Sequence, residues 1–467
     1  MTTSAVRKPS AAVDAMLKDL PMLDALMAGT GAMRAAGKTF LPQWPKEDDQ
    51  SYKDRLATAT LHPLFKRTAI VMAAKPLSRA ITFKDVPETI QELTAKIDDE
   101  GNTLHSFVAD LMLDIVARGI SGVLVDYPKV PRSIKTRAQE KAFGARPYFV
   151  RYPPGTVLGW RTEKRAGKTV LTQLRLLEFA PESDGDYAEK LVEQVRVLTP
   201  GAWEVWRKVA DKDEWFLYDN GRVSLKKIIP FVFFYGTRTG FGSGESPLIE
   251  LAYQNVEHWQ SASDQQTILH AARVPILFLS GFDDDASITV GASTALRSSN
   301  AEADAKYVEH TGNAIEAGRK SLLDLEERMR ATGAEMLVRR PGKVLAAQVH
   351  SEDDSQKCVL QRIVEVAEAS LNECLALMGA WMGQAQTGEL SLYKDFGVHT
   401  LAEATADLLL ELNLNGKLPD ETLFEELQRR DIISPDRKWA DEKNRLPDPV
   451  AKAPAPKPKQ APLPPEG

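Results

Sequence analysis

The chain has 467 residues, 43% of them hydrophobic and 27% charged, and is therefore long enough to bury two or three hydrophobic cores. Its formal net charge of −6 excludes a protein that binds nucleic acid over a uniformly basic surface, so any DNA contact must be local or weak. No stretch reaches 18 uncharged apolar residues, and 1–18 lacks a signal-peptide core. We therefore expect no membrane span and a protein that stays in the cytoplasm where it is made.

The two cysteines, Cys358 and Cys374, lie in one expected helix. Their separation of sixteen residues places them about 24 Å apart at roughly 1.5 Å per residue. A disulfide needs Cα atoms closer than about 7 Å, so they cannot pair within one chain. We predict two buried thiols in a reducing compartment.

Helical periodicity dominates the first third of the chain. The expected helices cover 11–36, 48–74 and 101–120. Pro42 and Pro45 stop any helix between the first two. A short apolar strand, 123–125, follows the third.

The region 146–235 reads as strands, because apolar, β-branched and aromatic residues alternate there. The expected strands are 148–152, 170–178, 191–198, 202–209 and 228–235. Asp219, Asn220 and Gly221 predict a turn. Helices followed by an antiparallel sheet indicate an α+β fold.

Long helices dominate the second half. Ser246 and Pro247 predict the start of a helix that ends near Ala272. Further helices are expected at 313–337, 351–382, 401–412 and 420–430, before a proline- and lysine-rich tail, 452–465, that we expect to be disordered. The segment 281–312 is small, polar and acidic, so the helices flanking it should need identical neighbouring chains to complete their core.

The sequence offers no convincing enzyme motif. Gly240, Gly242 and Gly244 resemble a phosphate loop, but no Lys-Ser or Lys-Thr follows, so we predict a flexible hinge. The seven histidines have no zinc-site spacing, and Asp283, Asp284 and Asp285 lack calcium-loop spacing. Asp126 is more simply a turn cap than a catalytic carboxylate. We expect no reaction, metal or cofactor.

Three stretches resemble portal proteins of tailed bacteriophages, in particular a family from short-tailed phages. They are Phe40-Leu41-Pro42 with Asp48-Asp49 and 52–76; Gly119 to Pro128 followed by Arg146-Pro147-Tyr148; and Gly242 to Leu248. The resemblance extends over about residues 20–435. Each motif is structural and individually weak, and their order carries the resemblance.

The resemblance implies a portal fold with an α+β wing, an antiparallel helical stem, a small clip and a helical crown. The implied parts are a wing at 1–245, a first stem helix at 246–273, a clip at 274–312, a second stem helix at 313–337, a tunnel loop at 338–350, a long wing helix at 351–399, a crown at 400–435 and a disordered tail at 436–467.

The resemblance also implies partners. Portal subunits form rings, typically of twelve, at one capsid vertex of the virion, after assembly in the host cytoplasm. Double-stranded DNA is packaged and ejected through the ring, which docks the terminase large subunit and later the head–tail adaptor, alongside major capsid and scaffolding proteins. No membrane is involved.

A DNA conduit must hold DNA without gripping it, since affinity rises steeply with the number of neutralised phosphates. Ring symmetry turns one cation into a belt of charge. The first candidates for such a belt are Arg339, Arg340 and Lys343, for which a solvated turn at a helix C-terminus is the plainer interpretation. The second candidates are Arg319, Lys320, Arg328 and Arg330, where ion pairs with neighbouring acids explain most of the pattern.

Two alternatives stay open at this point. The chain could be another capsid-associated structural protein, such as a head–tail adaptor or a scaffold, which would lack two long helices around a small segment. It could also be a hydrolase or nucleotide-binding enzyme, for which nucleotide turnover by the purified chain would be the sign.

Overall fold

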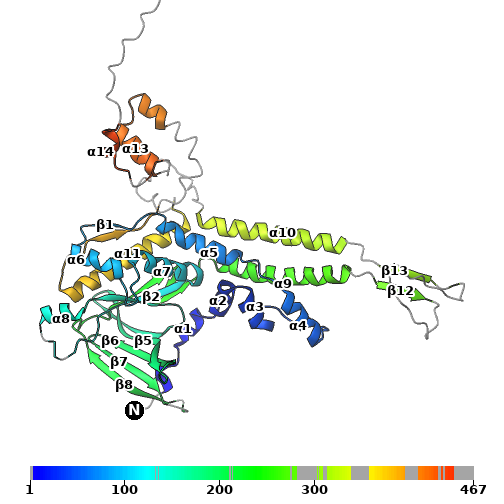
Figure 1. Cartoon of the computed structure of the whole chain (residues 1–467), viewed down its shortest axis with the longest axis horizontal. Helices are drawn as coiled ribbons and strands as arrows, with labels where there is room; N and C mark the ends of the chain where they lie inside the picture. Colours follow the sequence, from blue (N-terminus) through cyan, green and yellow to red (C-terminus); the bar gives the residue numbers. More distant parts are fainter. Residues whose placement is uncertain are drawn as a thin grey trace, which may run out of the picture. The chain divides into compact units, whose positions relative to one another are not determined.

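The computed structural model describes residues 4–445 apart from 132, 135, 210–211, 213, 274–275, 281–301, 303, 309–312, 338–356, 395–408, 430–432 and 435–436. The chain divides into two compact units, Met1–Lys394 and Asp395–Gly467. The first unit combines helices with antiparallel sheets (Figure 1), which confirms the α+β class at that level. No helix within the described ranges is long and apolar enough to cross a membrane.

Helices occupy the first third of the chain. They are α1 (Ala11–Met16), α2 (Leu20–Ala28), α3 (Thr30–Ala36), α4 (Asp49–Thr58), α5 (Leu64–Ala74), α6 (Glu88–Gln91) and α7 (Leu104–Arg118). The two longer helices with side-chain caps follow the sequence signals: the Asp48 carboxylate accepts hydrogen bonds from Gln50 N and Ser51 N, and Thr103 Oγ1 accepts one from Ser106 N.

The single helix expected over 11–36 is instead three short ones. Pro21 lies in the first turn of α2. A helix can begin with proline at this position, but proline has no backbone N–H to donate, so α1 cannot continue into α2. Gly29, with a φ of 97°, separates α2 from α3, and Gly37, with a φ of 55°, ends α3. These left-handed conformations favour glycine, and they redirect the chain at each step.

A three-stranded sheet lies at the centre of the first unit. Its order is β3 (Tyr148–Tyr152), β2 (Ile120–Asp126) and β9 (Phe231–Tyr235), all antiparallel. Six of the seven residues of β2 and all five of β9 are buried. The helix α11 (Val359–Met382) packs on β9, and a small sheet of β1 (Thr82–Lys84) and β14 (Glu389–Ser391) lies beside α11.

A five-stranded meander forms the second sheet. Its strands follow chain order: β4 (Val157–Arg165), β5 (Lys168–Ser183), β6 (Glu189–Thr199), β7 (Ala202–Lys208) and β8 (Trp215–Arg222). The strands β4 and β8 were not predicted. The turn predicted at 219–221 is wrong, because these residues pair with β7.

Gly221 explains that error. It lies opposite Trp203, and a Cβ at position 221 would come within 2.7 Å of the Trp203 ring. The glycine therefore makes room for a cross-strand indole, a role of glycine within strands that looks like a turn signal in the sequence.

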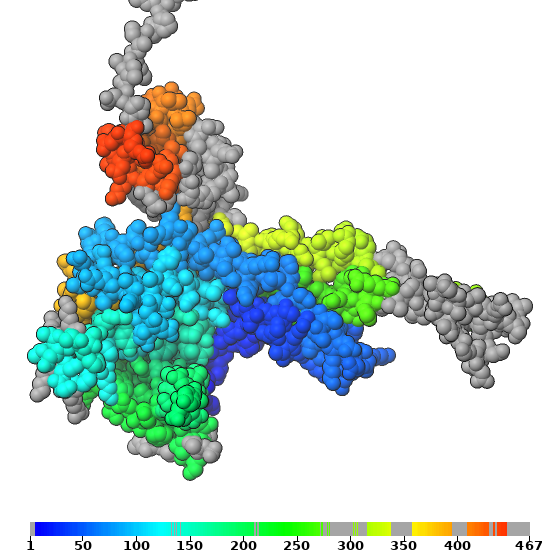
Figure 2. Space-filling model, viewed as in Figure 1, coloured from blue at the N-terminus to red at the C-terminus, as the bar shows by residue number. Residues whose placement is uncertain are grey.

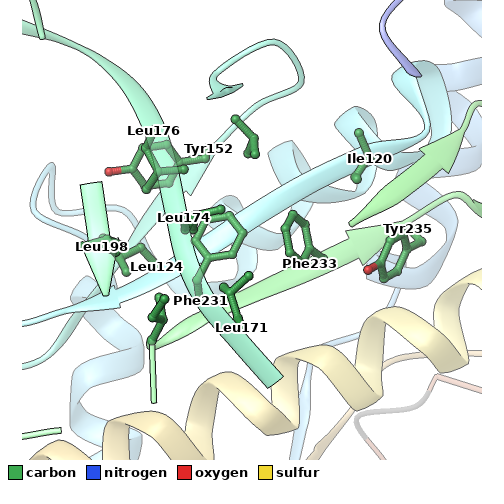
Figure 3. Close-up of a cluster of buried hydrophobic side chains, with 12 residues drawn as sticks. Ile120, Leu124, Tyr152, Leu171, Leu174, Leu176, Leu198, Phe231, Phe233 and Tyr235 are labelled. Atoms are coloured by element: carbon green, nitrogen blue, oxygen red, sulfur yellow. The ribbon is translucent and has the colours of Figure 1, made fainter. Parts of the chain in front are cut away.

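The main core joins the two sheets (Figure 3). Figure 3 shows Leu171 and Leu174 of β5 near Phe231 of β9, and Leu176 of β5 beside Tyr152 of β3. Phe231 and Phe233 meet edge to face, with ring centroids 4.9 Å apart. At one margin of this core, the Arg196 guanidinium of β6 bridges Asp126 at the end of β2 and Glu178 of β5. The interpretation of Asp126 as a turn residue therefore misses its ion pair.

The remaining described elements of the first unit include two hairpins and the two helices that follow them. The hairpin β10 (Thr237–Gly240)–β11 (Ser243–Glu245) leads into α9 (Ile249–Ala272), and the ribbon β12 (Ile276–Ser280)–β13 (Asp304–Val308) leads into α10 (Asn313–Ala334). A short helix, α8 (Arg137–Phe143), precedes β3. Cys358 caps α11 and Cys374 lies within it; both thiols are buried and free, as predicted.

The second unit is described in part. It contains a helix at 409–414, α13 (Asp420–Arg429) and α14 (Trp439–Lys443). Phe424 of α13 and Trp439 of α14 pack with ring centroids 5.5 Å apart, so an aromatic contact joins these two helices.

Candidate functional site

The candidate site is the helix pair α9–α10, together with the junction from which α9 begins. α9 and α10 lie side by side (Figure 1), and α10 forms an exposed yellow ridge in Figure 2. Three contacts fix an antiparallel register. Gln265 Nε2 donates to Ile315 O at 2.9 Å, His258 Nε2 lies 3.4 Å from Glu326 Oε1, and a Cβ on Gly333 would lie 3.8 Å from Leu251.

Three glycines form the junction at the start of α9. Gly119, at the end of α7 with a φ of 90°, accepts a hydrogen bond from Gly236 N at 2.8 Å through its carbonyl. A Cβ on Gly119 would lie 2.1 Å from Glu245 C, one on Gly236 2.2 Å from Ile115 O, and one on Gly244 2.6 Å from Gly119 O. Such approaches of backbone to backbone leave no space for a side chain. We name these three residues the glycine junction.

Ser246 fastens the start of α9 to the glycine junction. Its Oγ accepts a hydrogen bond from Leu248 N at 3.1 Å and donates one to Val116 O of α7 at 3.0 Å. Pro247 and Leu248 form a turn, and the helix begins at Ile249, slightly later than predicted. The same hydroxyl group therefore joins the last turn of α7 to the turn that precedes α9, which helps to fix the direction of α9 relative to α7.

The hinge glycines occupy different surroundings. A Cβ placed on Gly240 would lie no closer than 3.8 Å to its nearest contact, Ser243 Cβ. Gly242, with a φ of 67°, lies against the Trp160 ring, and Gly244 belongs to the glycine junction. Two of the three are therefore held by packing. A hinge function for them stays a prediction.

The helix pair buries apolar side chains within one copy. Trp259 of α9 is fully buried, and so are Leu325 and Met329 of α10. The prediction that these helices cannot bury their apolar sides without a neighbour is wrong for this stretch. Three large apolar side chains of the pair are left exposed: Tyr253 at 49%, Ile268 at 37% and Leu323 at 47%.

Polar residues fill much of the interface of α9. Asn255, His258, Ser263 and Gln265 are all buried. Asn255 Nδ2 donates to His62 O, and its Oδ1 accepts from Phe65 N, both at 2.9 Å, which fixes the start of α5 to α9. Burial lowers the pKa of His258, although Glu326 acts in the opposite direction.

The cations predicted on α10 lie on its exposed surface. Arg319 pairs with Glu316 within the helix, and Arg330 pairs with Glu326 and Glu327. Arg328 reaches Glu257 of α9 at 3.7 Å. Within the described residues, Lys320 makes no ion pair. Pairing with neighbouring acids of the same helix therefore accounts for Arg319 and Arg330, whereas Arg328 pairs across to α9. Contact of these cations with DNA stays a prediction.

The other predicted cations, Arg339, Arg340 and Lys343, lie outside the described residues, as does the acidic run Asp283–Asp285. Among described residues, no cluster of histidine, cysteine, aspartate and glutamate could hold a metal ion.

A buried ion pair near α9 was not predicted from the sequence. Arg55 Nε lies 2.7 Å from Glu47 Oε1, and both side chains are only 3% exposed. Arg55 also stacks on Trp44 at 4.2 Å and lies 3.8 Å from Asp264 of α9. Arg55 occurs in the sequence stretch that resembles portal proteins, but charged residues give no sequence signal for burial. The pair joins α4 to the turn before it, and the approach of Arg55 to Asp264 connects α4 with α9.

Comparison of the sequence with known protein families and curated proteins gives one partial match. A family model described as a domain of unknown function, DUF4055, matches residues 247–382, which span α9, α10 and α11 but less than half of the chain. No curated protein matches the sequence.

Solved structures give weak likenesses. One is the neck of a native GTA particle computed with C12 symmetry, with 13% identity, a TM-score of 0.42, and coverage of 79% of this chain and 89% of that one. Another is the neck of an empty GTA particle computed with C6 symmetry, with 13% identity, a TM-score of 0.42, and coverage of 79% and 90%. A third is the virion of a native gene transfer agent (GTA) particle, with 15% identity, a TM-score of 0.39, and coverage of 78% and 88%. These TM-scores do not establish a shared fold.

Proposed function

We propose that the chain is a structural subunit of a phage-type portal, which assembles into a ring around a DNA channel and catalyses no reaction. The helix pair carries the proposal. Two long antiparallel helices, joined through a two-stranded ribbon, begin from a wing of helices and antiparallel sheets, in the chain order that the resemblance to portal proteins implies.

The proposal divides the described elements into three parts. In this proposal the elements before Ser246 and the helix α11 belong to the wing, α9 and α10 to the stem, and the ribbon β12–β13 to the clip. The glycine junction and Ser246 give the stem a direction fixed by the wing, which a channel wall needs if all subunits are to present the same surface. The exposed Leu323, Ile268 and Tyr253 leave apolar surface for neighbouring stems.

The proposal predicts rings. Purified full-length protein, viewed by negative-stain electron microscopy, is expected to give end-on rings with a central opening wide enough for duplex DNA. Protein that stays monomeric under all assembly conditions would overturn the proposal. A closed oligomer without an opening would favour the head–tail adaptor or scaffold alternative.

The proposal also predicts a DNA-handling role for the tunnel-loop cations. Arg339→Glu with Arg340→Glu is expected to leave ring assembly intact and to reduce packaged or retained DNA several-fold, because each reversal is repeated around the ring and repels phosphates. The measurement is DNA protected from nuclease in assembled particles. Arg165→Glu, which reverses one end of an exposed pair with Glu163 on β4, is the comparison variant. Unchanged packaging in the double variant would remove these residues from the channel.

A further inference from the structure

His258 lies where three elements meet. Its ring on α9 is 5% exposed, and its Nε2 lies 3.4 Å from Glu326 Oε1 of α10. On its other side is His62, in the turn before α5, with ring centroids 5.1 Å apart and planes tilted by 38°. The same turn is hydrogen-bonded to α9 through Asn255, one helical turn before His258.

The hydrogen bonding of His258 is incomplete. Its Nδ1 is buried and has no hydrogen-bond partner among the described residues. In the neutral ring this atom can be the unprotonated nitrogen, while Nε2–H points to the Glu326 carboxylate. Protonation would give Nδ1 a buried N–H without an acceptor, and a buried donor of this kind is costly.

The charges around the ring are unequal. Glu326 on α10 attracts an imidazolium, but its second oxygen, Oε2, is already paired with Arg330 at 2.9 Å. His62, on the opposite side, offers no compensating charge and repels when it is protonated itself. Glu257, the neighbour of His258 on α9, is exposed and is held by Arg328. Protonation therefore favours the contact with α10 and opposes the contact with the turn before α5.

We propose that His258 is a proton-sensitive joint: when neutral it holds the α9–α10 pair against the start of α5, and its protonation releases that start while the two helices stay paired. The inference goes beyond the proposed function and does not depend on ring formation. Under this proposal, the attachment of the helix pair to the start of α5 changes with pH.

The direction of the pH effect follows from the linkage between protonation of His258 and opening of the joint. Burial lowers the pKa of His258, so the open state binds protons more readily than the closed one. The joint is tightest above the ordinary histidine pKa of about 6.5 and weakens as the pH falls below it. One pH unit below that value, opening is favoured by up to about tenfold over neutral pH.

Hydrogen–deuterium exchange of full-length protein at pH 7.5 and 5.5, corrected for intrinsic rates, tests this. The Phe65 amide, which donates to Asn255 Oδ1, reports on the joint. Peptides covering 62–68 are expected to lose protection several-fold at pH 5.5, while peptides within 320–333 of α10 keep theirs. The oligomeric state is checked by light scattering at both pH values.

Three variants separate the joint from general acid sensitivity. His258→Gln removes the titrating group and should abolish the pH response of 62–68. His270→Gln, which replaces an exposed histidine on the same helix, should keep the full response. His62→Gln removes the repelling neighbour and should reduce the response.

Two results would overturn the proposal: wild-type protein without a pH response, or the same response in His258→Gln as in His270→Gln. If circular dichroism shows that His258→Gln does not fold, the decision passes to His62→Gln, and a response equal to that of His270→Gln then refutes the joint. Rings that form normally alongside such a result would leave the proposed function untouched.

Discussion

Gly244→Ala is expected to destabilise the first unit by about 3 kcal/mol or more, the upper part of the range for overpacking. The new Cβ would lie 2.6 Å from Gly119 O and 3.3 Å from Thr237 O, both backbone atoms that cannot rotate away. Moving Gly119 O breaks its hydrogen bond with Gly236 N, and α9 loses its fixed direction. Thermal or urea unfolding followed by circular dichroism measures the loss.

Gly240→Ala is the matched control for this substitution. Gly240 lies in the same hairpin, has no left-handed φ, and would place its Cβ no closer than 3.8 Å to a neighbour. Its free energy of unfolding should stay within about 0.5 kcal/mol of wild type. Equal stability of the two alanine variants would show that the glycine junction is not packed as described.

Asp114→Ala is expected to cost about 3 kcal/mol of stability. The Asp114 carboxylate is 3% exposed and accepts hydrogen bonds from Arg151 Nη1 at 2.5 Å, Arg118 Nη1 at 3.0 Å and Ser121 Oγ at 3.2 Å. Removing it leaves two guanidinium groups without their buried partner, the situation in which broken buried ion pairs are most costly. Both arginines keep partial contact with water, which places the expected loss at the low end of that range.

Asp110→Ala provides the comparison one helical turn earlier. Asp110 approaches the same Arg151, but at 3.8 Å and with its side chain 62% exposed. Exposed pairs contribute about 0–1 kcal/mol, so this variant should unfold almost as wild type does. Urea denaturation of both variants, with unchanged slopes, checks the difference. A loss in Asp110→Ala as large as that in Asp114→Ala would contradict burial as the cause.

Local signals located much of this fold. The sequence predicted the bounds of α7, α9 and α10 to within a few residues. Pro21 and Gly29 were also visible, but their effect depends on φ angles and on neighbours, so one helix was predicted where three short ones exist.

The candidate site was less accessible to sequence reasoning. Arg319 and Arg330 of α10 were identified as ion-pair partners because their acids lie three or four residues away. The contact of His258 with His62 and Glu326 joins residues 196 and 68 positions apart, and no spacing rule relates them. The same is true of Arg55 and Asp264.

The amino-acid sequence by itself determined the alternation of helices and strands, the two long helices around a small polar segment, and the burial of both cysteines, because each follows from local periodicity and composition. Only the tertiary structure decided that Gly244 meets Gly119, that Gly221 makes room for Trp203, and that the helix pair buries Trp259 and Met329 within one copy. These features depend on distances between segments far apart in the chain, and such distances are set by packing, which local sequence does not encode.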